Sequence, residues 1–328
     1  MKKGILLVNL GTPNDCSTKS VRSYLKQFLS DARVIELNSI MRWILVNCFI
    51  LPTRPKKSAH AYQKIWCKNG SPLMINSINL KNDIQLELGS KYDVELAMRY
   101  GYPSIKNAMT KFENYDEITI LPMFPQYASA TTGSIIEQIF SITKNNKVFP
   151  NLKIIRDFYN NPSFIKPQAK IISNLLEDDD YLLLSYHGLP ENQLKSSGCK
   201  KGNNLNCTNT SDCHSGCYLS QCLKTSELIQ HELNLDSSRI TSSFQSRLGR
   251  TPWIKPYTDE VLQDLRKKGI QNLAVACPSF ISDCLETLEE IGIQAKEQWL
   301  ALGGKRFKLI PCLNNELKWV KGLIEILK

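Results

Sequence analysis

The sequence predicts an α/β fold built from two doubly wound parallel sheets. Short runs rich in β-branched residues alternate with longer stretches of helical periodicity, which is the pattern of parallel strands joined by crossover helices. Four candidate strands lie on each side of the turn signal Asn160-Asn161-Pro162. Because 328 residues are enough for two domains, we place an N-terminal half at residues 1–160 and a C-terminal half at residues 161–328.

The expected strands of the first half are Gly4–Asn9, Val94–Met98, Ile118–Pro122 and Lys153–Phe158. Those of the second half are Tyr181–Ser185, Arg239–Phe244, Leu273–Cys277 and Phe307–Pro311. The helices expected between them include Ser20–Ser30, Asn76–Leu88, Ile135–Thr143 and Thr258–Lys268. Open α/β sheets bind ligands beyond the carboxyl ends of their strands. The polar residues found there predict an active cleft: Asn9, Arg99, Tyr100, Gln126, Tyr127, His187, Gln245, Ser246, Asp283 and Glu286.

The two halves echo each other in sequence. Residues 6–13 and 183–190 share the form L-L-x-x-x-G-x-P. Residues 122–131 and 278–287 both run from Pro-x-Phe to a threonine nine positions after the proline. Strand–turn–proline signals also recur by chance, but two of them in the same order favour a duplicated unit.

Composition and charge limit the class of partner. Hydrophobic residues make up 42% of the chain, which fits an ordered globular protein, and the formal net charge is +10. A positive balance suits nucleic acid, an acidic membrane surface or a carboxylated small molecule. The opening residues show no secretory signal, and the longest apolar stretch, Ile40–Pro52, is too short to span a membrane. We therefore expect a cytoplasmic protein.

His187 comes directly after a buried-looking strand. One interpretation is a strand-end histidine that only bonds a backbone group. The other is a neutral imidazole that accepts a proton or binds a metal, as histidine does near neutral pH. The position of His187 in the second copy of the Gly-x-Pro turn favours the functional interpretation.

An acidic segment follows the seventh expected strand and should begin a helix, with Ser282 as its N-cap. Asp283, Glu286 and Glu290 would then share one helical face, and Glu289 would be solvated. Acids in a first helical turn can simply complement the helix dipole. Beside a strand end, such a row can also pass a cation or protons into a cleft.

Seven segments resemble those of ferrochelatases in order and spacing, from residue 3 to about residue 325. They are VNLGTP, AMRYGYP, FPQYASATTGS, SYHGLP, FQSRLGRTPW, PYTDE and SDCLETLEE. The resemblance implies a chelatase-like fold of two flavodoxin-like halves around a porphyrin cleft. It also implies a lyase that inserts ferrous iron into protoporphyrin IX to give protohaem, the last step of haem biosynthesis.

The same resemblance assigns site residues. His187 matches the active-site histidine and Glu286 the facing catalytic glutamate, both of them also ligands for the iron substrate. Asp283 and Glu290 match the acidic residues behind that glutamate. How His187 and Glu286 divide the pyrrole protons and the metal stays open. Cys284 stands where animal ferrochelatases have a histidine, which counts against a mechanism that needs a second imidazole. The implied substrate contacts are Arg54, Ser71, Arg99, Tyr100, Tyr127, Gln245, Ser246, Trp253 and Phe280, with Tyr100, Trp253 and Phe280 as apolar walls.

The apolar stretch Ile40–Pro52 has two interpretations. It can be a core helix, or a hydrophobic lip that takes porphyrin from the membrane with help from Arg54, Lys56 and Lys57. The apolar lips of ferrochelatases favour the second interpretation. We therefore expect peripheral contact with the inner face of the membrane.

Residues 196–222 form a polar insert with four cysteines spaced C-x7-C-x5-C-x3-C: Cys199, Cys207, Cys213 and Cys217. A run so poor in apolar residues cannot fold by burial, so a cross-link must hold it. Four thiolates suit zinc or an iron–sulfur cluster, and disulfides are not expected in a cytosolic chain. The insert resembles the one with which some bacterial ferrochelatases hold a [2Fe-2S] cluster, which implies that cluster rather than zinc. Cys222 and His214 are not expected to be ligands.

Three rival functions are a related chelatase that uses coproporphyrin or another metal, a non-enzymatic metal-sensing regulator, and a haem carrier. No helix-turn-helix or clustered basic recognition helix supports a DNA-binding regulator, so we expect no nucleic-acid partner. The expected partners are protoporphyrin IX and ferrous iron, for a monomer or a homodimer.

Overall fold

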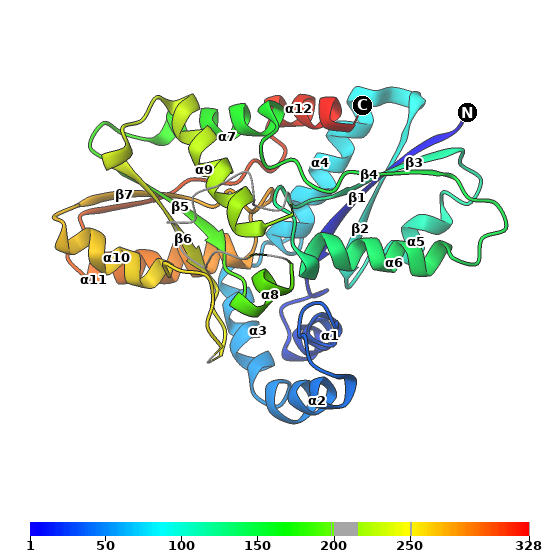
Figure 1. Cartoon of the computed structure of the whole chain (residues 1–328), viewed down its shortest axis with the longest axis horizontal. Coiled ribbons are helices and arrows are strands. Elements are labelled where there is room, and N and C mark those ends of the chain that lie inside the picture. The colour runs from blue at the N-terminus through cyan, green and yellow to red at the C-terminus, as the bar shows by residue number, and fades with distance from the viewer. Residues whose placement is uncertain (198, 200–215, 250, 328) are drawn as a thin grey trace. The chain divides into compact units, whose positions relative to one another are not determined.

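The computed structural model describes residues 1–197, 199, 216–249 and 251–327. The chain divides into two units (Figure 1). Unit 1 comprises residues 1–124 and 128–157 together with Leu327, and unit 2 comprises residues 125–127 and 158–326. Each unit holds one four-stranded parallel sheet, so the predicted α/β class with two parallel sheets is confirmed.

The sheet of unit 1 has the strand order β2-β1-β3-β4. Its strands are β1 (Lys3–Gly11), β2 (Asp93–Tyr100), β3 (Glu117–Pro122) and β4 (Asn151–Ile154). The fourth strand begins and ends earlier than the expected Lys153–Phe158. The ladder between β3 and β4 stops after the bond from the Ile155 N–H to the Ile120 carbonyl, because Pro122 has no N–H to continue it.

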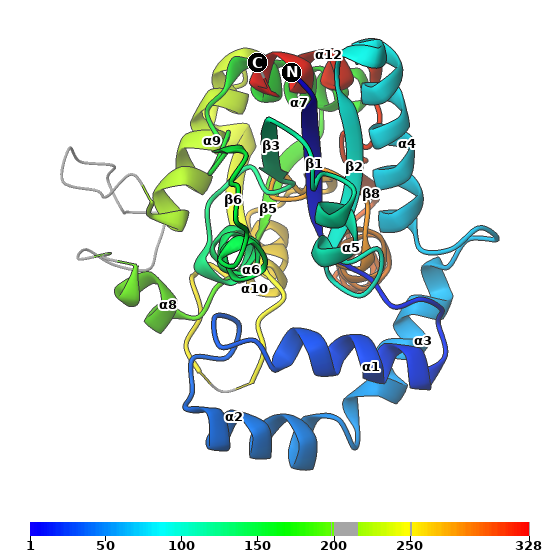
Figure 2. The same ribbon diagram turned by 90° about the vertical axis from the view of Figure 1, so that its right-hand side faces the viewer.

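Helices cover both faces of this sheet. On one face, α5 (Ile105–Thr110) and α6 (Ser134–Thr143) pack on alternate strand residues such as Leu6 and Ile120. On the other face lies α4 (Pro72–Leu88), followed by the short η2 (Gly89–Lys91) (Figure 1). The remaining helices lie beyond the carboxyl ends of the strands (Figure 2): α1 (Thr18–Leu29), α2 (Ser39–Ile44), η1 (Leu45–Ile50) and α3 (Arg54–Ile65).

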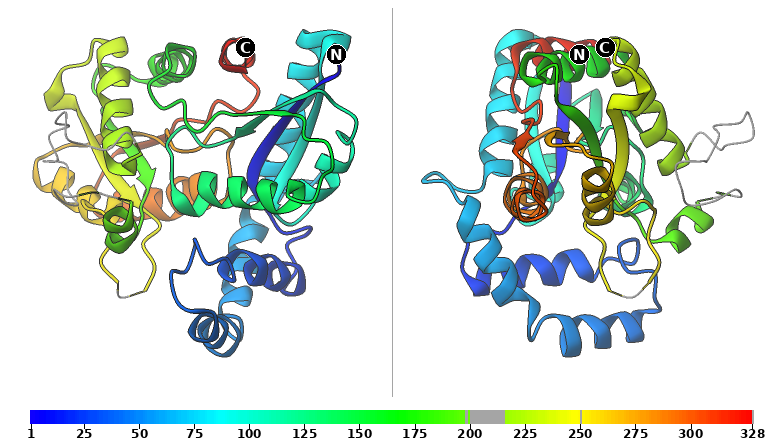
Figure 3. Two further views of the ribbon diagram at one scale, coloured as in Figure 1. Left: turned by 45° about the vertical axis from the view of Figure 1, so that its right-hand side comes forward. Right: turned by 90° about the vertical axis from the view of Figure 1, so that its left-hand side faces the viewer.

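The sheet of unit 2 has the equivalent order, β6-β5-β7-β8. Its strands are β5 (Tyr181–His187), β6 (Ile240–Gln245), β7 (Asn272–Ala276) and β8 (Arg306–Leu309). Two helices, α7 (Pro162–Leu175) and α9 (Tyr218–Leu233), cover one face, and α10 (Thr258–Lys267) and α11 (Lys296–Ala301) cover the other (Figure 3). The remaining elements are α8 (Glu191–Ser196), η4 (Ser237–Arg239), η5 (Glu286–Ala295) and α12 (Leu317–Leu327).

The sequence echoes fall at equivalent places in the two sheets. Both orders are the doubly wound order of flavodoxin-like sheets without a fifth strand. In each unit the third strand leads into a π-helix that continues as an α-helix: η3 (Ser129–Gly133) into α6, and η5 into α11. The two units therefore share a topology and a local irregularity.

The apolar stretch Ile40–Pro52 is not a core helix. None of the residues of α2 is buried, and in η1 only Val46 is. Trp43 is 62% exposed and Phe49 67%, so this segment presents a large apolar surface to solvent. None of the helices in the described ranges is long and apolar enough to cross a lipid bilayer.

An ionic cluster around one buried carboxylate joins the start of β5 to β8. Asp180, whose side chain is 0% exposed, accepts hydrogen bonds from Arg306 Nη2 at 2.8 Å, Lys308 Nζ at 3.3 Å and the Glu177 backbone N–H. Burial alone would raise the pKa of this carboxyl. The hydrogen bonds from Glu177, Arg306 and Lys308 outweigh burial and hold its pKa below the ordinary value.

We expect Asp180→Asn to lower the free energy of unfolding by roughly 2 kcal/mol at pH 7. A depressed native pKa contributes stability above the unfolded pKa of about 4, and that stability is lost as the pH falls through the native pKa. The difference between the variant and the wild type should therefore shrink as the pH falls below about 5. Urea unfolding at several pH values measures it. Asp179→Asn, at a side chain 64% exposed, is the matched control and should change little.

Candidate active site

Polar and acidic residues gather at the carboxyl ends of the strands of unit 2. His187 is the last residue of β5 and lies opposite Gln245, the last residue of β6. His187 was predicted to follow the strand, whereas it pairs with Gln245 in the ladder between β5 and β6. The acidic residues follow β7, the next strand on the other side of β5. This is the edge at which parallel sheets bind ligands.

The backbone of His187 is held on both sides. Its N–H donates to Ser279 Oγ at 3.0 Å, and its carbonyl accepts from Tyr218 Oη at 2.7 Å. The ring Nδ1 lies 2.6 Å from the Gly188 carbonyl oxygen. A carbonyl only accepts, so Nδ1 carries the proton, and in the neutral ring Nε2 keeps its lone pair. The geometry thus provides one imidazole nitrogen that can accept a proton or bind a metal.

Aromatic side chains flank the imidazole. The centroid of the Trp253 ring is 6.3 Å from that of His187, and the centroid of Phe280 is 6.2 Å away. Gly188 permits this arrangement, because a Cβ atom there would lie 2.9 Å from the Gln245 carbonyl oxygen and 3.2 Å from the Trp253 ring. The two half-buried aromatic rings give the imidazole an apolar surround.

The acidic segment differs from the predicted helix. Ser282 does not cap it, since η5 begins at Glu286 and is a π-helix. Asp283 lies before the helix, and its carboxylate accepts from Asn314 Nδ2 at 2.8 Å, from the Cys312 N–H at 3.2 Å and from Thr287 Oγ1 at 3.2 Å. Three donors from two segments hold Asp283 in a non-helical position, so Asp283 does not share a helical face with Glu286 and Glu290 as predicted.

Glu289 was also predicted wrongly. It is 3% exposed rather than solvated, and it accepts a hydrogen bond from Gln294 Nε2 at 2.6 Å. A π-helix bonds residue i to i+5, which turns side chains to different angles from those of an α-helix. The single-face argument from α-helical spacing therefore does not apply here.

Glu290 is also held by several hydrogen bonds. Its Oε1 accepts from the Ser246 N–H at 2.7 Å and its Oε2 from Ser246 Oγ at 2.5 Å. Burial raises the pKa of Glu290, and the nearby Glu286 carboxylate adds to this, while Ser246 and His187 oppose it. The charges of both His187 and Glu286 thus influence the pKa of Glu290.

Gln245 and Ser246 support these acids. The Nε2 of Gln245 donates to the Glu286 carbonyl at 2.8 Å and to Glu290 at 3.3 Å, and its Oε1 accepts from Ser185 Oγ. Ser246 adopts φ +67°, a rare conformation for a side-chain-bearing residue, and its hydrogen bonds to Glu290 hold it there. Tyr127, also in unit 2, is half-buried, and its N–H donates to Gln221 Oε1 at 2.6 Å.

The predicted substrate residues of unit 1 lie at two places. Arg99 and Tyr100 end β2, and the Tyr100 side chain is 2% exposed, so it is not an open wall in this structure. Arg54 is the first residue of α3 and is half-buried. Ser71 is 3% exposed and caps α4, accepting a hydrogen bond from the Met74 N–H at 3.2 Å.

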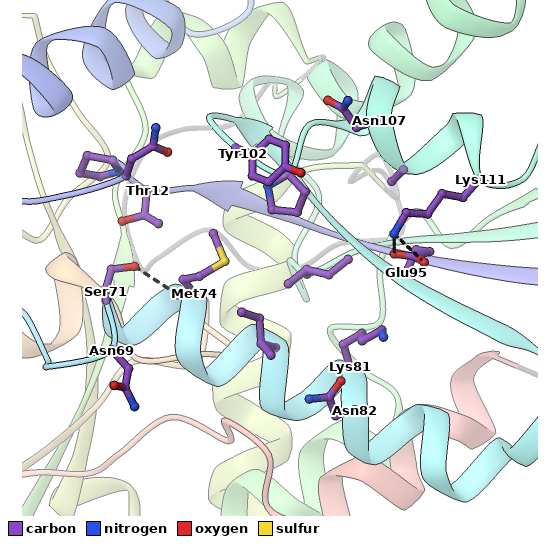
Figure 4. A pocket seen from close by; sticks show the side chains of 17 residues that line it. Thr12, Asn69, Ser71, Met74, Lys81, Asn82, Glu95, Tyr102, Asn107 and Lys111 are labelled. Carbon is purple, nitrogen blue, oxygen red and sulfur yellow. Dashed lines mark hydrogen bonds and ion pairs between the residues drawn. The ribbon is translucent and has the colours of Figure 1, made fainter.

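Ser71 also lines a cavity of about 540 Å³ within unit 1, between α4 and the outer edge of β2. Figure 4 shows Met74 and Lys81 on α4, with Tyr102 across the cavity. Of the predicted site residues in unit 1, Arg54, Arg99 and Tyr100 do not line it. The cavity is therefore separate from the strand-end cluster of Arg99 and Tyr100.

The cysteine insert is described only at its ends. Cys199 is half-buried, and Cys217 is buried directly before α9. Cys222 lies inside α9 and is 0% exposed. Cys207, Cys213 and His214 fall outside the described residues. Within the part of the chain that the structure describes, no three His, Cys, Asp or Glu side chains form a metal-binding group.

Comparison with known proteins identifies the family. The family model described as Ferrochelatase matches residues 2–328. The chain belongs to the ferrochelatase family. It is 51% identical over 326 residues to the ferrochelatase of Legionella pneumophila (strain Philadelphia 1), covering 99% of this chain and 98% of that one. It is 47% identical over 334 residues to the ferrochelatase of Coxiella burnetii (strain Dugway 5J108-111), covering 100% and 93%.

Solved structures show the fold of this ferrochelatase-family chain. It is similar to SirB from Bacillus subtilis with Fe3+, with a TM-score of 0.57 and 12% identity over 99% of this chain and 94% of that one. It is also similar to the sirohydrochlorin chelatase SirB from Bacillus subtilis subspecies spizizenii in complex with cobalt, with a TM-score of 0.56, 10% identity and coverage of 100% and 94%. The predicted chelatase-like fold is confirmed.

The partners that hold the predicted site residues of each unit in place were not predicted from the sequence. Tyr218 and Ser279 bond His187 from 31 and 92 positions away. Asn314 bonds Asp283, and Asp31 bonds Arg99 across 68 positions. No short spacing pattern connects these partners.

Proposed function

We propose that His187 and Glu286 carry the reaction of this ferrochelatase, the insertion of ferrous iron into protoporphyrin IX that completes haem biosynthesis. The observation that supports this most is the strand-end cluster of unit 2. It combines an imidazole whose Nε2 keeps its lone pair with the acids of η5. Membership of the ferrochelatase family makes the protein a metal-inserting enzyme.

The chemistry needs proton acceptors and a transient metal ligand. A free-base porphyrin gives up two pyrrole protons as Fe²⁺ enters, and the iron keeps its oxidation state. His187 Nε2 can accept a proton or hold the ion, and the Glu286 carboxylate can do the same. Glu290, with its raised pKa, is suited to receive protons from the pair and release them to solvent. Asp283 keeps the start of η5 in place.

The other predicted residues take supporting roles. Trp253 and Phe280 supply the apolar surfaces that a macrocycle requires. Because Gln245 and Ser246 already donate to Glu290 or to the Glu286 carbonyl, we assign them to orienting the acids rather than to the propionates. We assign porphyrin contacts to the remaining residues: Arg54, Ser71, Arg99 and Tyr127, with Tyr100 supporting Arg99.

The deciding experiment is anaerobic incubation with protoporphyrin IX and ferrous iron, followed by loss of the free-base absorption spectrum. We expect conversion to protohaem that needs both substrates. Parallel incubations with coproporphyrin, or with cobalt or nickel in place of iron, distinguish a protoporphyrin ferrochelatase from a related chelatase with another substrate or metal. Retention of haem without metallation of free porphyrin would favour a haem carrier, and salt-dependent DNA binding without metallation a regulator.

We further propose that the insert holds a [2Fe-2S] cluster through Cys199, Cys207, Cys213 and Cys217. The support is their C-x7-C-x5-C-x3-C spacing within a polar segment. Such a cluster would brace a segment that has no apolar core of its own. The anaerobically purified protein should be reddish-brown, with equal amounts of iron and acid-labile sulfide. A colourless protein containing zinc would refute the cluster.

Membrane contact is proposed through the apolar surface of α2 and η1, on a cytoplasmic protein that binds the inner face of the membrane peripherally. Its exposed Trp43 and Phe49 suit insertion among lipids, and the cationic Lys56 and Lys57 on α3 suit anionic head groups. A porphyrin is poorly soluble in water, so a membrane-bound entrance would shorten its path through solvent.

Replacing Trp43 and Phe49 together by serine should weaken binding to anionic vesicles at least about tenfold, because each buried aromatic side chain contributes roughly 1.5–3 kcal/mol. Vesicle co-sedimentation measures the change. Leu86→Ser, at an 81%-exposed leucine of α4, is the matched control and should leave binding unchanged. Equal binding of the double variant and the wild type would contradict the proposed contact.

A further inference from the structure

A single carboxylate organises the carboxyl end of β2 in unit 1. Asp31 lies just after α1, and its side chain is 8% exposed. One oxygen, Oδ2, accepts from Arg99 Nη2 at 2.6 Å, from Tyr100 Oη at 2.8 Å and from Ser134 Oγ at 2.6 Å. The Asp31 carboxylate thus touches the last two residues of β2 and the first residue of α6.

Arg99 is fixed by several groups at once. Besides Asp31, its Nε donates to Ser134 Oγ at 2.6 Å, and its Cζ lies 4.6 Å from the centroid of the Tyr100 ring. An arginine side chain loses much rotamer freedom when it is ordered for binding. Here that ordering is already present, and Arg99 keeps N–H donors beyond the two engaged by Asp31 and Ser134.

Asp31 is also the first residue of the segment that leads to the apolar surface of α2 and η1, and both its side chain and its backbone carbonyl accept hydrogen bonds from that segment. The Arg33 N–H donates to Asp31 Oδ1 at 2.8 Å, and the Val34 and Ile35 N–H groups donate to the Asp31 carbonyl. Arg42 of α2 in turn donates to the Ile35 carbonyl at 3.3 Å. Asp31 is therefore the junction between β2, α6 and this segment.

We propose that Asp31 is a positioning residue that holds the Arg99 guanidinium in the orientation in which it contacts porphyrin. The proposal rests on the proposed function, which assigns Arg99 to the porphyrin. Asp31 neutralises part of the Arg99 charge and sets its direction, so its effect on porphyrin binding passes through Arg99. An ion pair that only stabilises the fold would affect porphyrin binding with or without Arg99.

The test is a double-mutant cycle on porphyrin affinity, measured by quenching of porphyrin fluorescence in the full-length protein without iron. Asp31→Asn keeps the size of the side chain and removes its charge. We expect it to raise the Kd for protoporphyrin IX about fivefold to tenfold, and Arg99→Gln to raise it similarly. In the Arg99→Gln background, Asp31→Asn should add less than about twofold, because coupled residues are not additive.

Steady-state kinetics adds a second readout. Asp31→Asn should raise the KM for porphyrin while leaving the KM for ferrous iron unchanged. Glu95 lies on the same strand as Arg99 and forms a 2.9 Å ion pair with Lys111. Glu95→Gln breaks that pair, so it is the matched control and should change neither the KM for porphyrin nor the KM for iron. Ser134→Ala removes the hydrogen bonds that Ser134 makes to Arg99 and to Asp31. It can therefore replace Asp31→Asn in the same cycle if that variant does not fold.

Additive effects in the cycle, an unchanged Kd in Asp31→Asn, or an unchanged Kd in Arg99→Gln would each overturn the positioning role. Failure of the proposed function looks different. In that case the wild-type protein would insert no iron, whereas the fluorescence cycle would still report whether Asp31 acts through Arg99.

Discussion

His187→Ala and Glu286→Ala should each lower the rate of iron insertion at least about a thousandfold while the protein stays folded. Removal of a positioned proton acceptor typically costs between about 10² and 10⁴ in rate. His187 and Glu286 are also proposed to bind the metal, so the loss should be near the upper end of that range. Because the His187 backbone is held by Ser279 and Tyr218 rather than by its ring, losing the imidazole should leave β5 intact. Spectroscopic assay of porphyrin metallation, with circular dichroism as the folding check, measures both effects.

Matched controls exist for both substitutions. His231 is an exposed histidine near the end of α9, and Glu297 is an exposed glutamate on α11, the direct continuation of η5. Alanine at either position should leave activity within about twofold of the wild type. Near wild-type turnover in His187→Ala or Glu286→Ala would remove that residue from the reaction.

The second large effect is expected at Asp283. Asp283→Ala leaves Asn314 Nδ2 and the Cys312 N–H without this acceptor in a buried place, whereas Thr287 Oγ1 can still donate to the Cys284 carbonyl. Each buried unsatisfied group costs about 1–3 kcal/mol, so a loss of roughly 3–5 kcal/mol in the free energy of unfolding is expected. Activity should fall as well, since these bonds hold the start of η5, where Glu286 lies.

Urea unfolding separates the two consequences for Asp283. Asp264→Ala, at an exposed acid of α10 paired only with Lys267, is the comparison and should stay within about 0.5 kcal/mol of the wild type. Asp283→Asn keeps one acceptor oxygen, so its free energy of unfolding should lie between those of Asp283→Ala and the wild type. If Asp283→Ala proved as stable as the wild type, the hydrogen bonds described for this carboxylate would not be the ones that hold the segment.

The strands were readable from the sequence because hydrophobic periodicity is a local signal. The runs that form β1, β5 and β7 are buried on both faces, and their composition alone marks them. The edge strand β4 was placed less well. Its end depends on Pro122 of another strand, and that is a tertiary effect.

The candidate site was readable only in part. His187 stands at a strand end, where position in the fold already suggests chemistry. The π-helical form of η5 and the burial of Glu289 were not readable, because they depend on a local helical register and on packing rather than on a repeating pattern. The same holds for Asp31 and Tyr218, whose importance lies in partners that are distant along the chain.

The π-helices η3 and η5 carry a consequence for the history of the molecule. Both follow the third strand of their sheet, yet η3 reads Ser-Ala-Thr-Thr-Gly and contains no ionisable side chain, whereas η5 contains Glu286, Glu289 and Glu290. The π-helical turn is therefore not caused by the acids, since it forms in η3 without them. A duplicated ancestral unit would have passed this turn to both descendants. In that case the two copies would share the backbone turn and differ in its charge, since η5 carries three glutamates and η3 carries none.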